Sequence, residues 1–441
     1  MMLQRATYRW VTVLLAAASQ CLLAQADKPP DHWVATWAAS PQQGRVLTPP
    51  GPPRARAAQA PAASRAPALP RPILDFQNQT VRMILHTTIG GRRARVEFSN
   101  AFGAGPLAIG AAHLAIRAKD SAIVPGSDRA LLFGGKPSFT IPPGALAVSD
   151  PVDLDIPAQG DLAVSVYVPG HVTEPTLHNT ALQTSYVARG DATGQAAIGE
   201  PVTTQSWYWI SGVDVLAPGD FAAVVAFGDS ITDGTRSTPD TNRSWPSQLA
   251  RRLLANPATA DVAVINEGIA GNRVLRDGAG ISALARFDRD VLSVPGVRWM
   301  FLMEGINDIG IGTRDTAQPA DAVTADDIIA GQRQIIERAH MHGIKVIGCT
   351  LTPYEGAAYY SEKGEPIREA INRWIRTGGA FDAVVDFDKV ERDPNHPNQF
   401  RADFNDGDHL HPNDAGYKAL AEAVDLSLFS NKPVWYASNT R

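Results

Sequence analysis

The first half of the chain contains short runs in which apolar and polar residues alternate. Residues 81–85 alternate, the glycine pair 90–91 follows, and residues 94–98 alternate again. This pattern predicts a β-hairpin, because successive side chains of a strand point to opposite faces. Residues 162–168 repeat the same period, and Gly and Pro interrupt the runs at short intervals. We therefore expect an antiparallel β-sandwich from about residue 73 to residue 220, with a barrel as the alternative.

The pattern changes at Phe221, where apolar runs begin to alternate with helical stretches. We expect strands at residues 221–227, 261–265, 297–303, 344–350 and 382–387. We expect helices near residues 244–255, 281–292, 325–341, 366–376 and 413–428. Alternation of this kind, with fully apolar strands, predicts an α/β fold in which helices cover both faces of a parallel sheet. Reactive side chains of such folds gather beyond the carboxyl ends of the strands.

The N-terminus has the features of a secretory signal peptide. Arg5 and Arg9 precede an apolar run of about 15 residues, and a small-x-small triplet ends at Ala26. The run is short for a membrane-spanning helix, which needs about 20 residues, so we favour a signal peptide at residues 1–26 over a membrane anchor. The mature protein is then expected to be secreted or periplasmic.

The remaining chain divides into two expected domains and a tail. A β-sandwich domain is expected at residues 27–219, and it carries an insertion at residues 47–72 that is rich in Pro, Ala and Arg. Such a composition has too few large apolar residues to pack a core. The α/β domain is expected at residues 220–431, and residues 432–441 form a C-terminal tail.

Composition narrows the possible partners. The chain has 441 residues, of which 44% are hydrophobic and 19% are charged, with a formal net charge of −5. Removing the two arginines of the signal peptide changes this charge to −7, and a mildly acidic protein gives no support for a nucleic-acid partner.

Cys21 leaves with the signal peptide, so Cys349 has no partner for an internal disulfide. We expect Cys349 to be a small buried residue.

A polar stretch directly follows the first strand of the expected α/β domain. In VVAFGDSITDG, Ser230 is either a nucleophile at a strand end or the N-cap of the next helix. A serine nucleophile needs an adjacent base, usually a histidine that a carboxylate orients. The polar turn FNDGDHLHPNDAGY offers such a pair in Asp408 and His411. The lipase-type G-x-S-x-G motif does not occur around Ser230.

Four blocks of the sequence resemble the SGNH (GDSL) hydrolase family. GDSIT resembles the first block, with Ser230 as nucleophile, and NEGIAGNR resembles the second, with Gly271 as a backbone N–H donor. EGINDIG resembles the third block, with Asn307 as a side-chain amide donor. DGDHLHP resembles the last block, with Asp408 and His411. All four blocks occur in the family's order.

The resemblance implies a three-layer α/β/α, flavodoxin-like hydrolase domain with a serine esterase mechanism. Ser230 would attack an ester carbonyl, His411 would transfer the proton, and Asp408 would hold the imidazole. The backbone N–H groups of Ser230 and Gly271 and the amide of Asn307 would stabilise the oxyanion. This mechanism requires no cofactor.

The substrate is expected to be a small ester or an acetylated carbohydrate. Family members with an added β-domain suggest O-acetyl groups on carbohydrate, and lysophospholipase, aryl-esterase and thioesterase activities are the alternatives within the class. A non-catalytic carbohydrate-binding protein is an alternative from another class. So is a metal-dependent hydrolase, whose ligands would be Asp406, Asp408, His409 and His411. Neither nucleic acid nor integral membrane association is expected.

Several other residues have more than one interpretation. Asp393 and His396 repeat the D-x-x-H-P pattern, but we expect His396 on a surface loop, because the helix after His411 resembles the C-terminal helix of the family. Glu304 and Arg273 either face the substrate or stabilise neighbouring segments. The aromatic run SWYWISG at residues 206–212 is expected to form core between the domains, with a sugar-binding wall as the alternative.

Overall fold

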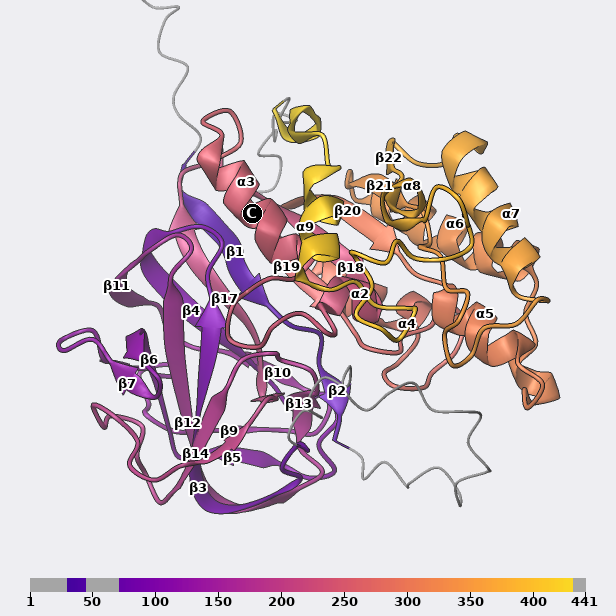
Figure 1. The fold of residues 1–441 in the computed structure, drawn as a ribbon. Coiled ribbons are helices and arrows are strands. Elements are labelled where there is room, and N and C mark those ends of the chain that lie inside the picture. Colours follow the sequence, from indigo (N-terminus) through magenta and orange to yellow (C-terminus); the bar gives the residue numbers. More distant parts are fainter. Residues whose placement is uncertain (1–29, 45–70, 431–441) are drawn as a thin grey trace, which may run out of the picture.

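The fold is taken from a computed structural model, which describes residues 30–44 and 71–430. The expected signal peptide, nearly all of the Pro/Ala-rich insertion and the C-terminal tail lie outside the described residues. A β-rich region, up to Ala217, lies beside an α/β region that begins at Ala222 (Figure 1). None of the helices formed by the described residues is both long enough and apolar enough to cross a membrane.

Two antiparallel sheets make up most of the β-rich region. The strands of the first sheet are, in order, β1 (His32–Ala38), β17 (Ile210–Ala217), β4 (Gly91–Ser99) and β10 (Leu146–Val148), with β11 (Val152–Ile156) also paired to β4. Those of the second are β15 (Val202–Thr204), β14 (Ser185–Arg189), β3 (Asp75–His86), β12 (Asp161–Thr173), β6 (Ala111–Lys119) and β7 (Ala122–Ile123), with β8 (Arg129–Ala130) paired to β6. Smaller sheets join β16 (Trp207–Tyr208), β13 (Thr176–His178) and β2 (Gln42–Gln43), and β5 (Leu107–Ile109) and β9 (Phe139–Ile141).

The apolar faces of the two large sheets share one core, as expected for two sheets packed face to face. The hairpin predicted for residues 81–98 is wrong, because β3 and β4 belong to different sheets. The connecting residues explain the difference. The Thr87 hydroxyl donates to the Pro157 carbonyl at 2.6 Å, and the Thr88 hydroxyl donates to the Thr36 carbonyl at 2.9 Å. The chain therefore crosses from one sheet to the other at this point.

The α/β region is built on one parallel sheet. Its strands lie in the order β19 (Val262–Gly268), β18 (Ala222–Gly228), β20 (Val297–Met303), β21 (Lys345–Cys349) and β22 (Ala383–Val385). The helices are α2 (Ser230–Asp233), α3 (Trp245–Ala255), α4 (Ala283–Phe287), α5 (Ile306–Thr313), α6 (Ala325–Met341), α7 (Glu365–Thr377), α8 (Phe387–Glu391) and α9 (Asp414–Glu422). A π-helical turn at Asp288–Leu292 continues α4, and 3₁₀ turns lie at Pro319–Asp321 and Leu426–Phe429.

Each face of the interior strand β18 packs against helices, which explains its uninterrupted apolar sequence. Val224 and Ala226 pack in one cluster with residues of α3 and α9. Val225 and Phe227 pack in another cluster with residues of α4 and α6. Cys349 is fully buried and free, and burial raises the pKa of its thiol, so the expectation of a small buried residue is confirmed.

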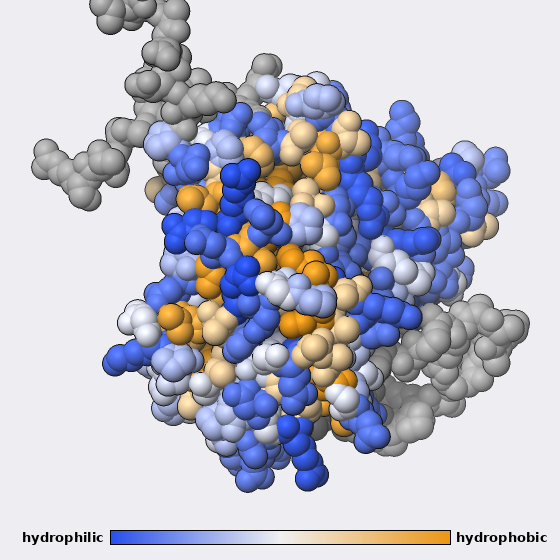
Figure 2. Space-filling model, turned by 90° about the vertical axis from the view of Figure 1, so that its left-hand side faces the viewer, coloured by the Kyte–Doolittle hydropathy of each residue, from blue (hydrophilic) through white to orange (hydrophobic). Residues whose placement is uncertain are grey.

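The two regions meet along β1, and their apolar core is continuous across this junction. The Ala35 N–H donates to the Pro295 carbonyl at 3.0 Å. Trp37 packs edge-on against Trp207, which comes from the aromatic run, with ring centroids 4.9 Å apart. Figure 2 shows the face at the left of Figure 1, on which hydrophilic side chains surround scattered apolar patches.

Candidate active site

Ser230 lies where β18 ends and the short helix α2 begins. The N-cap is Asp229, whose Oδ1 accepts the Ile231 N–H at 3.0 Å, so Ser230 is the first helical residue and does not cap the helix. Gly228 makes this tight turn possible, because a Cβ at this position would lie 2.7 Å from the Met303 carbonyl oxygen. Burial raises the pKa of Asp229 to about 7, although its hydrogen bond from Ile231 opposes this rise.

The loop before α9 brings His411 and Asp408 to Ser230. His411 Nε2 lies 2.8 Å from Ser230 Oγ, and His411 Nδ1 lies 2.7 Å from Asp408 Oδ2. The other oxygen, Asp408 Oδ1, accepts the backbone N–H groups of Leu410 and His411 at 3.0 and 2.9 Å. The ring is therefore held between the carboxylate and the hydroxyl, as a general base of this type requires.

Asp408 stays ionised in this setting. Burial alone raises the pKa of its carboxyl, but the hydrogen bond and charge of His411 and the two backbone donors outweigh burial and hold this pKa far below its ordinary value. Arg236 Nε lies 3.4 Å from the same Asp408 Oδ2 that faces His411.

His409 adopts a left-handed backbone conformation, with φ of 61°, and its side chain is not part of the contact between Asp408 and His411. Its Nδ1 lies 3.1 Å from the amide nitrogen of Asn405. Among the described residues, no group of three or more His, Cys, Asp and Glu side chains is arranged to hold a metal ion.

Gly271, in the loop after β19, and Asn307, in the helix after β20, both lie beyond the carboxyl ends of the parallel strands. Gly271 has φ of 80°, and a Cβ there would lie 3.0 Å from the Ala279 Cβ. Asn307, in the first turn of α5, donates through Nδ2 to the Asn272 carbonyl at 2.8 Å. Within the described part of the chain, the backbone N–H groups of Ser230 and Gly271 have no hydrogen-bond partner. Both donors are therefore available to an oxyanion.

Tyr359 is a site residue that sequence reasoning missed. Its hydroxyl donates to Asn307 Oδ1 at 3.2 Å, which fixes the amide so that its NH₂ group faces the loop of Gly271. Tyr359 lies in the loop between β21 and α7, and no motif or hydrophobic period marks this loop in the sequence.

Asp308 ties α5 to the same loop. Its carboxylate accepts the N–H groups of Val274 and Leu275 at 2.7 and 3.1 Å. Burial raises the pKa of Asp308 to about 6, and these two donors act against this effect. The side chain after Asn307 therefore fixes the position of the loop that Asn307 contacts.

The contacts of Glu304, Arg273 and His396 show which of their two interpretations the structure supports. Glu304 is fully buried and accepts from Arg286 at 3.2 Å, so it does not reach a substrate. Arg273 forms an ion pair with Asp321 at 2.9 Å. His396 is exposed, and its backbone N–H donates to the Asp393 carboxylate at 3.2 Å, so the second D-x-x-H-P segment is a surface turn as expected.

The chain was also compared with known protein families and known proteins. Residues 224–424 match the family described as GDSL-like lipase/acylhydrolase. No curated protein matches the chain.

Among the solved structures that are similar to part of the chain, three illustrate the match. One is a protein described as lipolytic and of the G-D-S-L family from Desulfitobacterium hafniense DCB-2, with 24% identity and a TM-score of 0.34, covering 46% of this chain and 97% of that one. The second is a catalytic mutant of an acetylxylan esterase from Geobacillus stearothermophilus, with 21% identity and a TM-score of 0.38, covering 49% and 97%. The third is the acetyl xylan esterase AlAXEase, with 24% identity and a TM-score of 0.36, covering 46% and 96%.

Proposed function

Because residues 224–424 are a GDSL-like lipase/acylhydrolase domain, we propose that this protein is a serine ester hydrolase that uses Ser230, His411 and Asp408 as its triad. The observation that carries the proposal is the unbroken chain of contacts from Ser230 Oγ through the His411 ring to Asp408, at 2.8 and 2.7 Å. Ser230 and His411 are 181 positions apart in the sequence, and the fold brings their side chains into contact.

The proposed reaction has two steps. Ser230 Oγ attacks the ester carbonyl while His411 Nε2 takes the hydroxyl proton, and the C–O bond to the alcohol breaks as His411 returns this proton to the leaving oxygen. In the second step water attacks the acyl-enzyme carbonyl while His411 takes one of its protons. The bond between the acyl carbon and Ser230 Oγ then breaks as His411 returns this proton to Oγ, which releases the carboxylic acid. Asp408 stabilises the charged imidazole in both steps.

The proposed oxyanion site has three donors, namely the backbone N–H groups of Ser230 and Gly271 and the side-chain amide of Asn307. One amide proton of Asn307 is engaged by the Asn272 carbonyl, which leaves the second for the oxyanion. Removal of one such donor typically lowers kcat by about 10²–10³-fold.

We further propose O-acetyl groups on carbohydrate as the substrate, and secretion or export to the periplasm as the destination. Both rest on the features of the sequence, namely the family resemblance and the N-terminal signal pattern. We also propose the three-layer, flavodoxin-like form for the α/β region. The order β19-β18-β20-β21-β22, with helices packed on both faces of β18, supports this arrangement.

The test uses the purified full chain and its Ser230→Ala variant with p-nitrophenyl acetate. We expect hydrolysis by the wild type, loss of nearly all activity in the variant, and no effect of EDTA. Ser237→Ala serves as the matched control, because Ser237 lies on the following loop and is also buried. Absence of hydrolysis would favour the carbohydrate-binding protein, and sensitivity to EDTA would favour the metal-dependent hydrolase.

A substrate panel then separates the esterase types. Acetylated xylan, acetylated pectin, a lysophospholipid, an acyl thioester and small aryl esters are compared by kcat/KM. The carbohydrate proposal expects an acetylated polysaccharide to give the highest value. A higher value for lysophospholipid, thioester or aryl ester would overturn the substrate class while leaving the serine mechanism in place.

A further inference from the structure

We propose that Ser40 and His178, both in the β-rich region, are positioning residues that hold the oxyanion loop of the α/β region in its working geometry. The oxyanion loop is defined as residues 269–273, and it contains Gly271. The inference rests on the proposed function, and it adds that the catalytic machinery extends beyond the part of the chain that matches the family. Two chains of buried hydrogen bonds carry it, one at each end of the loop.

The first chain passes through Arg286, a fully buried arginine whose donors reach the catalytic loops. Its Nε donates to Asn272 Oδ1 at 2.9 Å, directly after Gly271. Its Nη2 donates to the Gly228 carbonyl at 2.9 Å, two residues before Ser230. The planar guanidinium therefore holds the turn of Ser230 and the oxyanion loop at a fixed separation.

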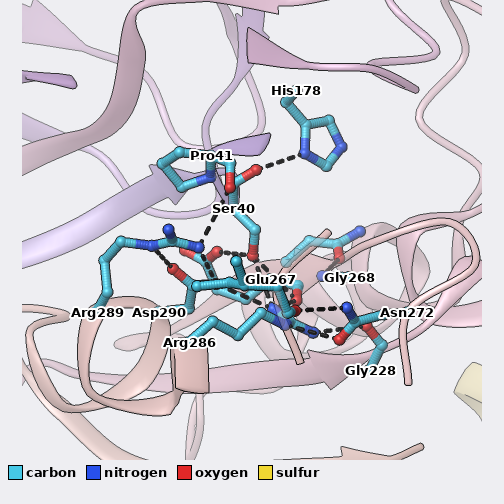
Figure 3. A network of polar contacts seen from close by, with 12 residues as sticks. Ser40, Pro41, His178, Gly228, Glu267, Gly268, Asn272, Arg286, Arg289 and Asp290 are labelled. Carbon is cyan, nitrogen blue, oxygen red and sulfur yellow. Dashed lines mark hydrogen bonds and ion pairs between the residues drawn. The ribbon is translucent and has the colours of Figure 1, made fainter. Parts of the chain in front are cut away.

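Ser40 fixes the position of Arg286. The Ser40 hydroxyl accepts from Arg286 Nη1 at 2.9 Å and donates to Glu267 Oε2 at 2.6 Å. Arg286 Nη1 also donates to the Glu267 carbonyl at 2.7 Å and to Asp290 Oδ2 at 3.1 Å. Figure 3 shows Ser40 entering this group from the β-rich side, directly above Arg286 and Glu267.

The second chain of hydrogen bonds also begins at Ser40, and it passes through His178. His178 Nδ1 donates to the Ser40 carbonyl at 2.9 Å, and its Nε2 lies 3.1 Å from Asp233 Oδ1 (Figure 3 shows the first of these contacts). The other oxygen, Asp233 Oδ2, accepts the Ala270 N–H at 3.0 Å. Ala270 directly precedes Gly271, so this chain reaches the opposite end of the loop from Asn272.

The side chains of Ser40, Arg286 and His178 are buried, so their hydrogen bonds restrict the geometry of the oxyanion loop. Ser40 and Arg286 are inaccessible to solvent, and His178 is 3% exposed. A buried polar group is costly to leave without a partner. Loss of the Ser40 hydroxyl removes the donor to Glu267 Oε2 and leaves Arg286 Nη1 with the Glu267 carbonyl and Asp290 as its acceptors. Both ring nitrogens of His178 face oxygen acceptors, and the charge of Asp233 raises the pKa of the imidazole against the effect of burial. A doubly protonated ring satisfies both contacts.

The test compares Ser40→Ala with Ser40→Thr in the full chain, with p-nitrophenyl acetate as substrate. Loss of the hydroxyl is expected to lower kcat by about 10-fold with KM within about twofold, because the oxyanion donors are displaced but not removed. Inhibition by phenylboronic acid, which forms a tetrahedral adduct with a serine nucleophile, is expected to weaken by the same factor. Thr keeps the hydroxyl and is expected to restore both values.

Thr36→Val is the matched control for a change that only destabilises the protein. The Thr36 hydroxyl is also buried on β1. It donates to the Ile89 carbonyl at 2.6 Å and accepts the N–H groups of Thr88 and Ile89, none of which belongs to the two series of hydrogen bonds described above. We expect a lower thermal midpoint and an unchanged kcat. His178→Gln tests the second chain and is expected to lower kcat by about 3- to 10-fold, again without a change in KM.

The outcomes distinguish the two proposals. A wild type that cleaves no ester overturns the proposed function. A wild type that is active while folded Ser40→Ala retains its kcat and its boronate affinity overturns the positioning role alone. Equal loss of kcat in Ser40→Ala and Thr36→Val would assign the effect to general destabilisation and would also overturn that role.

Discussion

Glu391 offers a direct physical test of the structure, because its carboxyl group is buried without a partner. The residue ends α8, its side chain is inaccessible to solvent, and neither of its carboxyl oxygens has a hydrogen-bond partner among the described residues. The group lies against α9, since a Cβ on Gly416 would be 3.1 Å from Glu391 Oε1. Burial raises the pKa of this carboxyl from 4.5 to about 8, although Arg401 acts in the opposite direction.

This raised pKa makes stability fall as pH rises. Between pH 4.5 and pH 8 the folded protein keeps a proton on Glu391 that the unfolded chain has lost, so the free energy of unfolding decreases with pH over this range. One pKa unit corresponds to about 1.4 kcal/mol, so the carboxyl removes about 3 kcal/mol of stability between pH 5 and pH 8. Below pH 4.5 this stability is fully present.

The perturbation is Glu391→Gln, which keeps the shape of the side chain and removes its titration. Urea unfolding of wild type and variant is measured from pH 5 to pH 8. We expect the difference in unfolding free energy to grow with pH by about 3 kcal/mol in favour of the variant. Glu422→Gln is the control, because Glu422 is exposed on α9, where it pairs with Lys418 at 3.3 Å. Parallel pH curves for wild type and Glu391→Gln would refute the reasoning.

Two further predictions concern the oxyanion site. Tyr359→Phe removes the hydroxyl that donates to Asn307 Oδ1, so the amide of Asn307 can turn. We expect kcat for p-nitrophenyl acetate to fall about 3- to 10-fold with unchanged KM, because the amide acts on the transition state. An unchanged kcat would contradict this role. Gly271→Ala places a Cβ on a residue with φ of 80°, at 3.0 Å from the Ala279 Cβ. Steady-state kinetics should show a loss of at least about 10-fold in kcat. A wild-type kcat in this variant would contradict the role of the loop.

The sequence predicted the α/β region well because its strands are uniformly apolar and its helices are amphipathic. The strand at residues 297–303 and the helix at residues 325–341 have the predicted bounds. The helix predicted near 281–292 is α4 continued by a π-helical turn, and the helix predicted at 413–428 ends at Glu422 before a 3₁₀ turn. Short helices such as α2 and α5, of four and eight residues, were missed because so few residues show no helical period.

The β-rich region shows where periodicity stops being informative. Alternation at residues 81–85 and 94–98 identified both strands but not their partners, since a period of two indicates a face and not a neighbour. The choice of sheet depends on the buried hydroxyls of Thr87 and Thr88, whose partners lie at distant positions in the sequence.

The residues of the candidate site also fall into those that local sequence patterns predicted and those that they did not. Ser230, Gly271 and Asn307 were predicted from motifs that follow strands, and Asp408 and His411 from the motif of the polar turn before α9. Tyr359, Arg286, Ser40 and His178 were not found, because each acts through a long-range hydrogen bond that no local pattern encodes. Burial of an arginine is a property of the folded chain, and its sequence neighbours give no sign of it.

The central claim is that Ser230 is a nucleophile activated by His411, and covalent labelling tests it most directly. The purified full chain is treated with a fluorophosphonate, and the intact mass and the modified peptide are measured by mass spectrometry. The account predicts one adduct per chain on Ser230, labelling slowed by about 10³-fold or more in His411→Ala, and none at this position in Ser230→Ala. An adduct on another residue, or equal labelling of wild type and His411→Ala, would contradict it.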